Sequence, residues 1–338
     1  MSECEEILRT NGIIFEQFQI NRTSLNPAQA FLNVLRLRAK LARLNPSVVH
    51  SVALKPAILT GIAILGLNIL NVISLGGLGT TFTKKGWREL ALKKLISVAL
   101  RWSMRLNRCA LILQNTRDVT IATTAFGVPP NKIHLIRGVG VDTDKFRPTV
   151  SQLKPPYIVL FAARLLAAKG ILEFVEAAKK ILETRDDVNF HICGRLDPLN
   201  PDSITSADTD SWESIVGLEY LGSRSDMSKV FLEASIVCLP TYYGEGLPKV
   251  LIESAACGIP IITTDMPGCN DIVVHGHNGV IIEPRSTQSL IDSLNFLLDD
   301  DELRKRMGEN GRSLVLENFS EAQCSLATLS VYKKGSLH

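Results

Sequence analysis

Short, almost wholly apolar runs alternate with longer amphipathic runs along the second half of the chain, and this alternation restricts the fold more than any other feature. Residues 157–162 (YIVLFA) and 236–240 (IVCLP) contain hardly any polar side chain. Strands of this composition are buried on both faces, as in parallel sheets that helices cover on each side. The expected strands are 157–162, 188–193, 236–240 and 260–264, and the expected helices are 171–184, 225–234, 248–257 and two or three from about 287 onward. The pattern predicts an α/β domain with a doubly wound sheet.

The first half shows the same alternation less regularly. Its expected strands are 13–20, 47–51, 69–74, 110–114 and 133–136, and its expected helices are one that begins at Pro27, 57–65 and 86–107. A chain of 338 residues is long enough for two domains. Prolines cluster at residues 147–156, where we expect the linker. We expect a Rossmann-like domain over 1–148, a second one over 149–320, and a C-terminal helix over 321–338 that packs back on the first domain.

Charge is distributed very unevenly between the two halves. Residues 1–150 hold 20 Lys and Arg against 8 Asp and Glu, whereas the rest of the chain is acidic. Between Arg22 and Arg117 the only acid is Glu89. Such a field attracts nucleic acid, anionic lipid or phosphorylated ligands. Because the basic residues lie on helices with apolar stripes and without interleaved aromatic residues, we favour an anionic membrane surface over nucleic acid as the partner.

We expect neither an export signal nor a membrane span. The acidic N-terminus lacks the apolar core of a signal peptide. The uncharged stretch 56–83 is long enough to cross a bilayer, but glycines and asparagines interrupt it, which favours a helix, a buried strand and a glycine loop. The seven cysteines form no C-x-x-C pair, and His275 and His277 have no further ligand nearby. We therefore expect reduced thiols, a cytoplasmic protein and no metal site.

Basic side chains follow one of the expected strands at a place where a phosphate could bind. Ligands of a doubly wound sheet gather beyond the carboxyl ends of its strands. Arg164 and Lys169 come after the strand 157–162, five residues apart around a strand-to-helix turn. Two cations beside a helix N-terminus can hold a diphosphate. Gly194, which ends the strand 188–193, is included among the ligand-binding candidates.

Two carboxylates follow the strand 236–240. Glu245 lies in a glycine-containing loop, where backbone N–H groups can approach a ligand closely. Glu253 falls in the second turn of the helix that Pro248 begins. We expect Glu245 to accept hydrogen bonds from sugar hydroxyls and Glu253 to accept them from a ribose diol. The two acids would then bind the two ends of a nucleotide sugar.

A competing interpretation of the two acids needs no ligand. Glu245 would be a solvated loop acid, and Glu253 would pair with Lys249, four residues before it on the helix. Two acids at this spacing are weak evidence by themselves. The turn that carries Arg164 and Lys169, together with the Gly-Leu-Pro between the acids, favours the functional interpretation.

These motifs resemble those of a known family. The segment EGLPKVLIESAACGIPIITTDMPGCNDIV is similar to the E-x7-E segment of retaining, GT-B fold glycosyltransferases of family 4, and AARLLAAKGILEFVEAA is similar to their Arg/Lys phosphate turn. The pattern extends over most of residues 155–320. In the first half, VVHSVALKPAILTG and ISLGGLGTTF resemble members that extend lipid-linked oligosaccharides of bacterial envelope polysaccharides. Family members begin with a β-α-β unit of roughly fifty residues that has no counterpart here, which implies an incomplete N-terminal domain.

The resemblance implies where substrates bind. Arg164 and Lys169 would hold the diphosphate of a nucleotide sugar, and Glu253 would hold its ribose. Uridine diphosphate sugars are the expected donors, with no cofactor besides. The acceptor would be a saccharide, linked to a polyprenyl diphosphate at an anionic membrane, so we expect the chain at the inner face of the membrane on its cytoplasmic side.

The implied reaction is transfer of a sugar with retention of configuration. Glu245 and the backbone of Gly246 and Leu247 would contact the donor sugar, and the cationic turn would stabilise charge on the departing diphosphate. No residue stands out as a covalent nucleophile. His50, at a strand end of the basic domain, is our candidate for contact with the sugar or the acceptor. The alternative is a histidine that is merely hydrogen-bonded at a strand terminus.

Two other classes of protein fit parts of the sequence. A non-catalytic nucleotide-sugar binder, a degenerate copy of such an enzyme, would bind the donor without turnover, and the missing first unit is consistent with it. A dinucleotide oxidoreductase would share the doubly wound sheet. It is disfavoured because SLGGLGTTF has the wrong glycine spacing for G-x-G-x-x-G, and no acid follows about twenty residues later.

Overall fold

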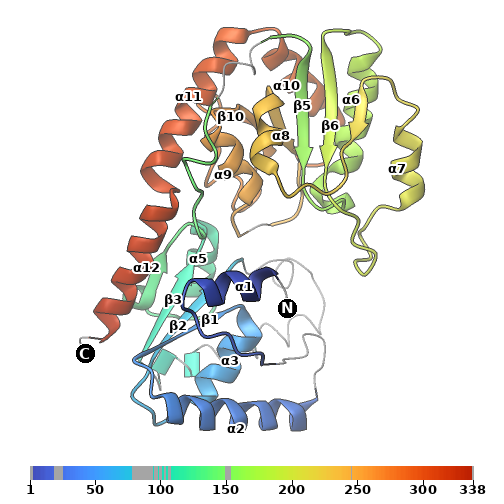
Figure 1. Ribbon diagram of the computed structural model, residues 1–338. Coiled ribbons are helices and arrows are strands. Elements are labelled where there is room, and N and C mark those ends of the chain that lie inside the picture. The colour runs from blue at the N-terminus through green and yellow to red at the C-terminus, as the bar shows by residue number, and fades with distance from the viewer. Residues whose placement is uncertain are drawn as a thin grey trace.

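The computed structural model of the chain has two α/β domains, one above the other in Figure 1. Each domain is built on its own parallel sheet, with four strands in the first domain and six in the second. The α/β fold class predicted from the alternation of apolar runs is therefore confirmed. The structure describes residues 3–18, 26–77, 94, 98, 101–102, 104–105, 108–148, 154–244 and 246–336.

The second sheet has the strand order of a complete doubly wound domain. Its strands are β5 (Tyr157–Ala162), β6 (Val188–Cys193), β7 (Leu218–Tyr220), β8 (Ile236–Leu239), β9 (Ile261–Thr264) and β10 (Gly279–Ile282). They lie in the order β10-β9-β8-β5-β6-β7, and all neighbours are parallel. Because β5 and β8 are neighbours, the chain winds outward from this pair in both directions. Ligands of such sheets bind beyond the carboxyl ends of this pair.

Helices cover the second sheet and close its core. They are α6 (Ile171–Leu182), α7 (Ser206–Trp212), α8 (Met227–Glu233), α9 (Lys249–Ala256), α10 (Thr287–Leu298) and α11 (Asp301–Asn318), with one turn of 3-10 helix, η3 (Ala167–Lys169). Phe174 of α6 lies between Phe161 and Phe190 of the sheet, with ring centroids 5.4 and 5.7 Å apart. The Asp300 side chain caps α11 by accepting a hydrogen bond from the Leu303 N–H at 2.8 Å.

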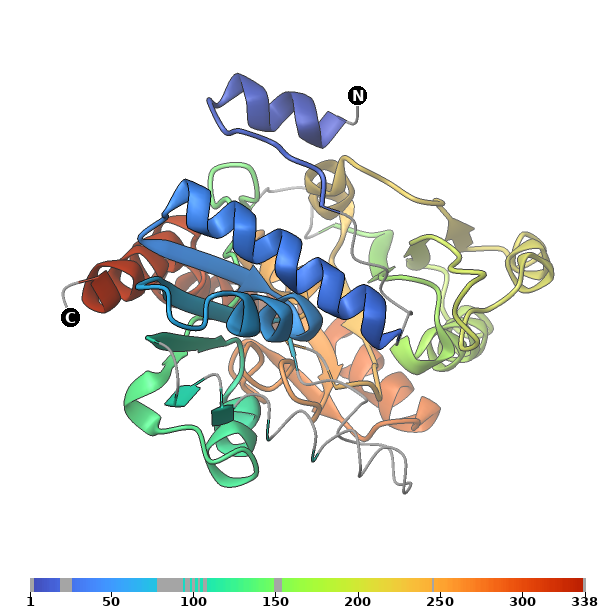
Figure 2. The same cartoon turned by 90° about the horizontal axis from the view of Figure 1, so that it is seen from below.

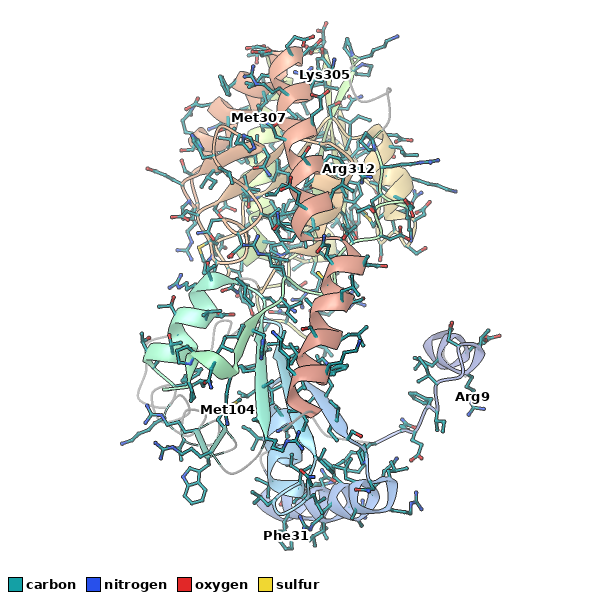
Figure 3. The ribbon with its side chains drawn as sticks, turned by 90° about the vertical axis from the view of Figure 1, so that its left-hand side faces the viewer. Arg9, Phe31, Met104, Lys305, Met307 and Arg312 are labelled. Atoms are coloured by element: carbon teal, nitrogen blue, oxygen red, sulfur yellow. The ribbon has the colours of Figure 1, made fainter. Side chains whose placement is uncertain are left out.

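The first sheet follows the chain without any reversal. Its strands are β1 (Val48–Val52), β2 (Leu70–Leu75), β3 (Cys109–Leu113) and β4 (Ile133–Leu135), paired in that order. The helices of this domain are α1 (Glu3–Thr10), α2 (Pro27–Leu44), α3 (Leu54–Ala63) and α5 (Thr116–Thr124), with a 3-10 turn, η1 (Pro130–Lys132). Helix α2 packs beside α3, whereas α1 stands apart from the domain (Figures 2 and 3). Among the described strands, only β2 pairs with β1.

The strand predicted over residues 13–20 is wrong. Residues 13–18 have no regular structure, Ile14 is 88% exposed, and residues 19–20 lie outside the described part of the chain. An apolar run becomes a strand only if its backbone groups find partners, and no described strand lies alongside this run. Most of the helix predicted over 86–107 also lies outside the described residues. The short strands β7 and β10 were missed, because three or four residues give too little pattern to detect.

The C-terminal helix α12 (Glu321–Ser336) returns to the first domain. Figure 1 shows α11 running beside the second domain and α12 continuing beside the first. Cys324 and Val331 of α12 pack in one apolar cluster with Leu70, Val72 and Ile112 of the first sheet. The end of the chain therefore completes the core on one face of that sheet.

The uncharged stretch that is long enough to cross a bilayer is folded into the first domain as far as it is described. It contributes most of α3 and all of β2, and residues 78–83 lie outside the described part. No helix in the ranges that the structure describes has both the length and the apolarity needed to cross a membrane. The six cysteines whose side chains are described are buried, and none of them is in a disulfide.

Arg312 of α11, labelled in Figure 3, ties the segment between the domains to the second domain. Its guanidinium donates hydrogen bonds to the carbonyl oxygens of Phe146 at 2.7 Å, Ala256 at 2.8 Å and Thr143 at 3.0 Å. Phe146 itself packs in the core of the second domain. Because buried carbonyl groups are costly to leave without a donor, this one side chain stabilises three segments together.

Arg312→Met is expected to lower the free energy of unfolding by about 2–4 kcal/mol, because it leaves three carbonyl groups without their charged donor. Urea denaturation measures the change. Arg306→Met, on an exposed position of the same helix, is the matched control and should change the stability by less than about 0.5 kcal/mol. Equal stabilities of the two variants would contradict the prediction.

Candidate functional site

Two loops meet beyond the carboxyl ends of β5 and β8. The Thr241 hydroxyl and the Tyr242 N–H both donate hydrogen bonds to the Ala168 carbonyl oxygen, each at 3.0 Å. Gly170 permits this approach, since its φ is 79° and a Cβ there would lie 2.2 Å from the Pro240 carbonyl oxygen. The turn after β5 and the loop after β8 therefore form one continuous surface.

Arg164 and Lys169 both belong to this surface and influence each other electrostatically. Lys169 is buried, with 9% of its surface exposed, and its Nζ lies 5.4 Å from the centre of the Tyr243 ring. Burial removes water from the ammonium group and, together with the charge of Arg164, lowers the pKa of Lys169 to about 8. Arg164 is exposed and forms an ion pair with Asp197 at 2.9 Å. The turn thus carries one exposed cation, Arg164, and one buried cation, Lys169.

A cavity of about 250 Å³ brings three of the predicted residues together. Arg164 after β5, Gly194 after β6 and Glu253 on α9 all line it. Arg195 and Arg224 also line the cavity, although sequence reasoning did not select them, and Arg224 forms an ion pair with Asp226 at 2.8 Å. Three arginines and one carboxylate thus line the cavity, a combination that suits a ligand bearing both phosphate and hydroxyl groups.

Glu253 forms the ion pair expected without a ligand and also lines the cavity, and its contact with a ribose stays a prediction. Its carboxylate lies 3.4 Å from the Nζ of Lys249, so the pair expected without a ligand exists. The same side chain is only 8% exposed and lines the cavity. Burial disfavours the charged form and raises the pKa of Glu253, while the nearby charge of Lys249 acts in the opposite direction. The carboxylate is thus held at the cavity wall by a cation that itself remains largely exposed.

The loop after β8 also touches the first domain. Glu245, the predicted sugar contact, lies outside the described residues. A Cβ at Gly246 would lie 1.8 Å from the Gly76 carbonyl oxygen, so no other residue fits at position 246 without moving the domains apart. Leu247 approaches Gly138, where an added Cβ would lie 3.7 Å from a Leu247 methyl group. The two domains therefore meet at the residues expected to contact the donor sugar.

His50 lies apart from the cavity that Arg164, Gly194 and Glu253 line. It lines a separate cavity of about 450 Å³ between the first sheet and α12, which Gly138 also lines. Its Nδ1 lies 2.6 Å from the Tyr332 hydroxyl and its Nε2 lies 2.6 Å from the Ser74 hydroxyl. Although the ring is exposed, the cavity walls remove part of its water, which lowers the pKa of His50. These contacts match the alternative of a histidine hydrogen-bonded at a strand end, and its contact with substrate stays a prediction.

Asn115 is a residue of this region that sequence reasoning missed. It follows β3, caps α5, and its side chain is completely buried. Its Nδ2 donates a hydrogen bond to the Gly246 carbonyl oxygen at 3.0 Å. The sequence Asn-Thr-Arg-Asp has the spacing of a helix start, which could have located the cap. Nothing local in the sequence indicates the contact with a residue of the other domain.

Comparison with known proteins gives matches over most of the chain. Residues 142–314 match the family described as glycosyl transferases group 1, and residues 6–145 match the one described as glycosyltransferase family 4. The chain is 27% identical to the N,N'-diacetylbacillosaminyl-diphospho-undecaprenol alpha-1,3-N-acetylgalactosaminyltransferase of Campylobacter jejuni, over 93% of this chain and 84% of that protein. It is 28% identical to the UDP-Gal:alpha-D-GlcNAc-diphosphoundecaprenol alpha-1,3-galactosyltransferase of Escherichia coli, over 81% of this chain and 71% of that protein. With other relatives the match spans about half of the relative's length.

A solved structure has the same fold. The glycosyltransferase of Rickettsia africae aligns over 99% of this chain and 88% of its own, with a TM-score of 0.81 and 19% sequence identity. The predicted fold of two Rossmann-like domains, the GT-B arrangement, is therefore confirmed. The resemblance that the motifs indicated is confirmed as well.

The stability of the chain should depend on pH through Lys169. Its pKa is about 8 in the folded chain against an ordinary value of 10.5, so unfolding takes up a proton between these two values. The buried charge lowers the free energy of unfolding by its full amount below pH 8, and this loss disappears as the pH rises toward 10.5. Lys169→Met is therefore expected to raise the free energy of unfolding at pH 7 by about 1–3 kcal/mol.

Urea denaturation of the wild type and Lys169→Met at pH 7, 8.5 and 10 measures this effect. The difference between the two proteins should shrink as the pH rises, because the wild type then loses its buried charge. A difference that stays constant across the three pH values would contradict the assignment of a depressed pKa to Lys169.

Proposed function

The chain belongs to the glycosyl transferases group 1 family, and from that premise we propose that it transfers a hexose or N-acetylhexosamine from a nucleotide-diphosphate sugar to a saccharide acceptor with retention of configuration. One observation carries the proposal: Arg164 and Glu253 line the same cavity, and the charge of Arg164 acts on Lys169, which belongs to the same turn. A nucleotide sugar has the matching groups, a diphosphate for the cations and a ribose diol for the carboxylate. Uridine diphosphate sugars are the proposed donors, and the name of the Escherichia coli relative specifies UDP-Gal.

The two cations would act in both binding and chemistry. Arg164 and Lys169 would hold the diphosphate, and negative charge would grow on it as its bond to the sugar breaks. A positive charge fixed in a buried wall stabilises that growing charge more than water does, because the surroundings have a lower dielectric constant. With a pKa of about 8, Lys169 is mostly protonated at neutral pH. A bound diphosphate would raise that pKa further.

The sugar would lie where the two domains meet. Glu245 and the backbone of Gly246 and Leu247 would contact it, and His50 would contact the sugar or the acceptor from the cavity of the first domain. The acceptor hydroxyl would attack the anomeric carbon from the face on which the diphosphate departs, which retains the configuration. The bond from the acceptor oxygen forms as the bond to the diphosphate breaks, and the hydroxyl proton passes to the departing phosphate oxygen.

A lipid-linked saccharide is the proposed acceptor. The names of the Campylobacter jejuni and Escherichia coli relatives both specify diphospho-undecaprenol. Such an acceptor is held at a membrane, and the basic half of this chain, with 20 Lys and Arg against 8 Asp and Glu over residues 1–150, suits an anionic surface. We place the chain at the cytoplasmic face of the membrane, attached peripherally.

Helix α2 supplies a surface that fits a membrane. Phe31, Leu32 and Leu35 are exposed on it by 62, 51 and 46%, and the basic side chains of Arg36 and Arg43 are exposed beside them. Figure 3 labels Phe31 on the outer side of the helix. The buried side of α2 packs in an apolar cluster with α3 and the first sheet. A helix that packs on its domain with one face and presents apolar and basic residues on the other is suited to lie in an anionic interface.

A screen of uridine and guanosine diphosphate sugars tests the donor site. The wild type should bind at least one of them and hydrolyse it slowly, and its affinity should fall as the pH rises through about 8, because Lys169 then loses its proton. Lys169→Met should weaken the binding of the nucleoside diphosphate about 10- to 100-fold, the loss of one charge-assisted contact. Titration calorimetry measures the affinities.

Lys180→Met is the matched control for the donor site, because Lys180 is an exposed cation on α6 of the same domain. It should bind nucleotides as the wild type does. Glu245→Ala should slow hydrolysis, and activity unaffected by this substitution would remove Glu245 from the site. Donor binding without turnover on any acceptor would select the non-catalytic binder, and a wild type without nucleotide affinity would refute the proposed function.

Flotation with lipid vesicles tests the membrane surface of α2. The wild type should float with vesicles that contain anionic phospholipid, less so at high salt, and should not float with purely zwitterionic vesicles. Changing Phe31 and Leu35 together to Ser should reduce the floating fraction several-fold, since it removes the apolar contact. Leu326→Ser, at an exposed leucine of α12, is the control and should float normally. Salt-independent flotation, or equal flotation of all variants, would argue against this surface.

A further inference from the structure

Asn115 is a first-domain residue that reaches the donor loop of the second domain. Its Oδ1 accepts a hydrogen bond from the Asp118 N–H at 2.8 Å and thereby caps α5. Its Nδ2 donates to the Asp118 carboxylate at 2.9 Å and to the Gly246 carbonyl oxygen at 3.0 Å. Because Asp118 offers a donor to one end of the amide and an acceptor to the other, only one orientation of the amide satisfies both contacts. That orientation directs the amide N–H toward Gly246.

The contact lies in a tightly packed part of the domain boundary. A Cβ at Gly246 would lie 1.8 Å from the Gly76 carbonyl oxygen and 2.7 Å from the Gln114 side-chain oxygen. Gly76 and Gln114 follow β2 and β3, so the strand ends of the first sheet press directly on the loop after β8. Asn115 adds a directed hydrogen bond to this packing, and its side chain is shielded from water. A shielded hydrogen bond of this kind holds its partner in one orientation.

Holding the Gly246 carbonyl also orients the next N–H group. The peptide unit is planar, and its C=O and N–H point in opposite directions when the bond is trans. Because the Gly246 carbonyl points at Asn115, the Leu247 N–H points away from it. Among the residues that the structure describes, none accepts a hydrogen bond from the Leu247 N–H. This donor group is therefore oriented by the first domain and available to a ligand.

We propose that Asn115 is a positioning residue for the donor sugar, which it serves by holding the Gly246 carbonyl so that the Leu247 N–H is aimed at the sugar. The proposal rests on the proposed function, in which the sugar lies against the loop after β8. The nucleotide part of the donor meets the cations and the carboxylate of the second domain, and Asn115 acts on the sugar part. The first domain thereby contributes to recognising a sugar-bearing donor rather than the bare nucleotide.

Asn115→Ser is expected to keep the cap of α5 and to remove the hydrogen bond to Gly246. Serine caps helices about as well as asparagine, but it lacks the amide N–H that reaches the Gly246 carbonyl. For the uridine diphosphate sugar that the wild type hydrolyses fastest, we expect kcat/KM to fall about 3- to 15-fold, the effect of one misoriented hydrogen bond. The affinity for uridine diphosphate alone, measured by calorimetry, should stay within about twofold of the wild type, since the nucleotide contacts are untouched. The NMR order parameters of the Gly246 and Leu247 N–H groups should fall, because the Gly246 carbonyl is no longer held in one orientation.

Thr116→Ala is the matched control, because Thr116 makes the neighbouring contact between the domains without touching Gly246. Its N–H and its hydroxyl both donate to the Asp271 carboxylate, each at 3.2 Å. This variant should keep the wild-type kcat/KM within about twofold. Asn115→Thr, which also retains a capping oxygen, should reproduce Asn115→Ser and replaces it if the serine variant does not fold.

Three results would overturn the inference: wild-type kcat/KM in both Asn115 variants, an equal loss of affinity for uridine diphosphate and for the sugar donor, or the same loss in Thr116→Ala. A wild type that binds no nucleotide refutes the proposed function independently. In that case the NMR order parameters still test the role of Asn115, because values for Gly246 and Leu247 that are unchanged in Asn115→Ser overturn it. Lower order parameters confined to these two residues support it.

Discussion

The close approach of Gly170 to the Pro240 carbonyl oxygen holds together the two loops on which the candidate donor site depends. It arises because β5 and β8 are neighbours in the second sheet, so that the turn after one strand and the loop after the other emerge side by side. Glycine at position 170 removes the Cβ that would force them apart. Lys169, the residue before it, is buried in this turn, and burial lowers its pKa. The packing of the loops and the lowered pKa of Lys169 therefore both follow from the neighbouring positions of β5 and β8.

The two domains differ in charge and would contact different parts of the substrates. The second domain holds the cavity with its guanidinium groups and the carboxylate of Glu253. The first domain is basic, carries the exposed apolar and basic face of α2, and encloses a separate cavity around His50. Gly246 belongs to the second domain, and Gly76 and Asn115 of the first domain contact its backbone. A transfer reaction needs two substrates brought together, and this is where the domains can do so.

Sequence reasoning succeeded where a segment carried its own pattern. Strands β5 and β6 have the bounds that their apolar runs predicted, and α6 begins at the predicted residue after a glycine turn. It failed for the described part, 13–18, of the strand expected over 13–20, because no described strand lies beside this apolar run to pair with its backbone. It also missed β7 and β10, which are too short for periodicity to be detected. A strand is defined by its partner, and a partner cannot be seen in a local pattern.

The sequence by itself determined the α/β class, the spacing of Arg164 and Lys169 around one turn, and the uneven charge of the two halves, because each depends on residues that are neighbours in the chain. Only the tertiary structure decided that Glu253 shares a cavity with Arg164, that His50 lies in another cavity, and that Asn115 reaches across to the donor loop. These outcomes depend on which strands become neighbours and how closely their loops pack. The lowered pKa of Lys169 belongs with them, since burial is a property of the folded surroundings and not of the lysine.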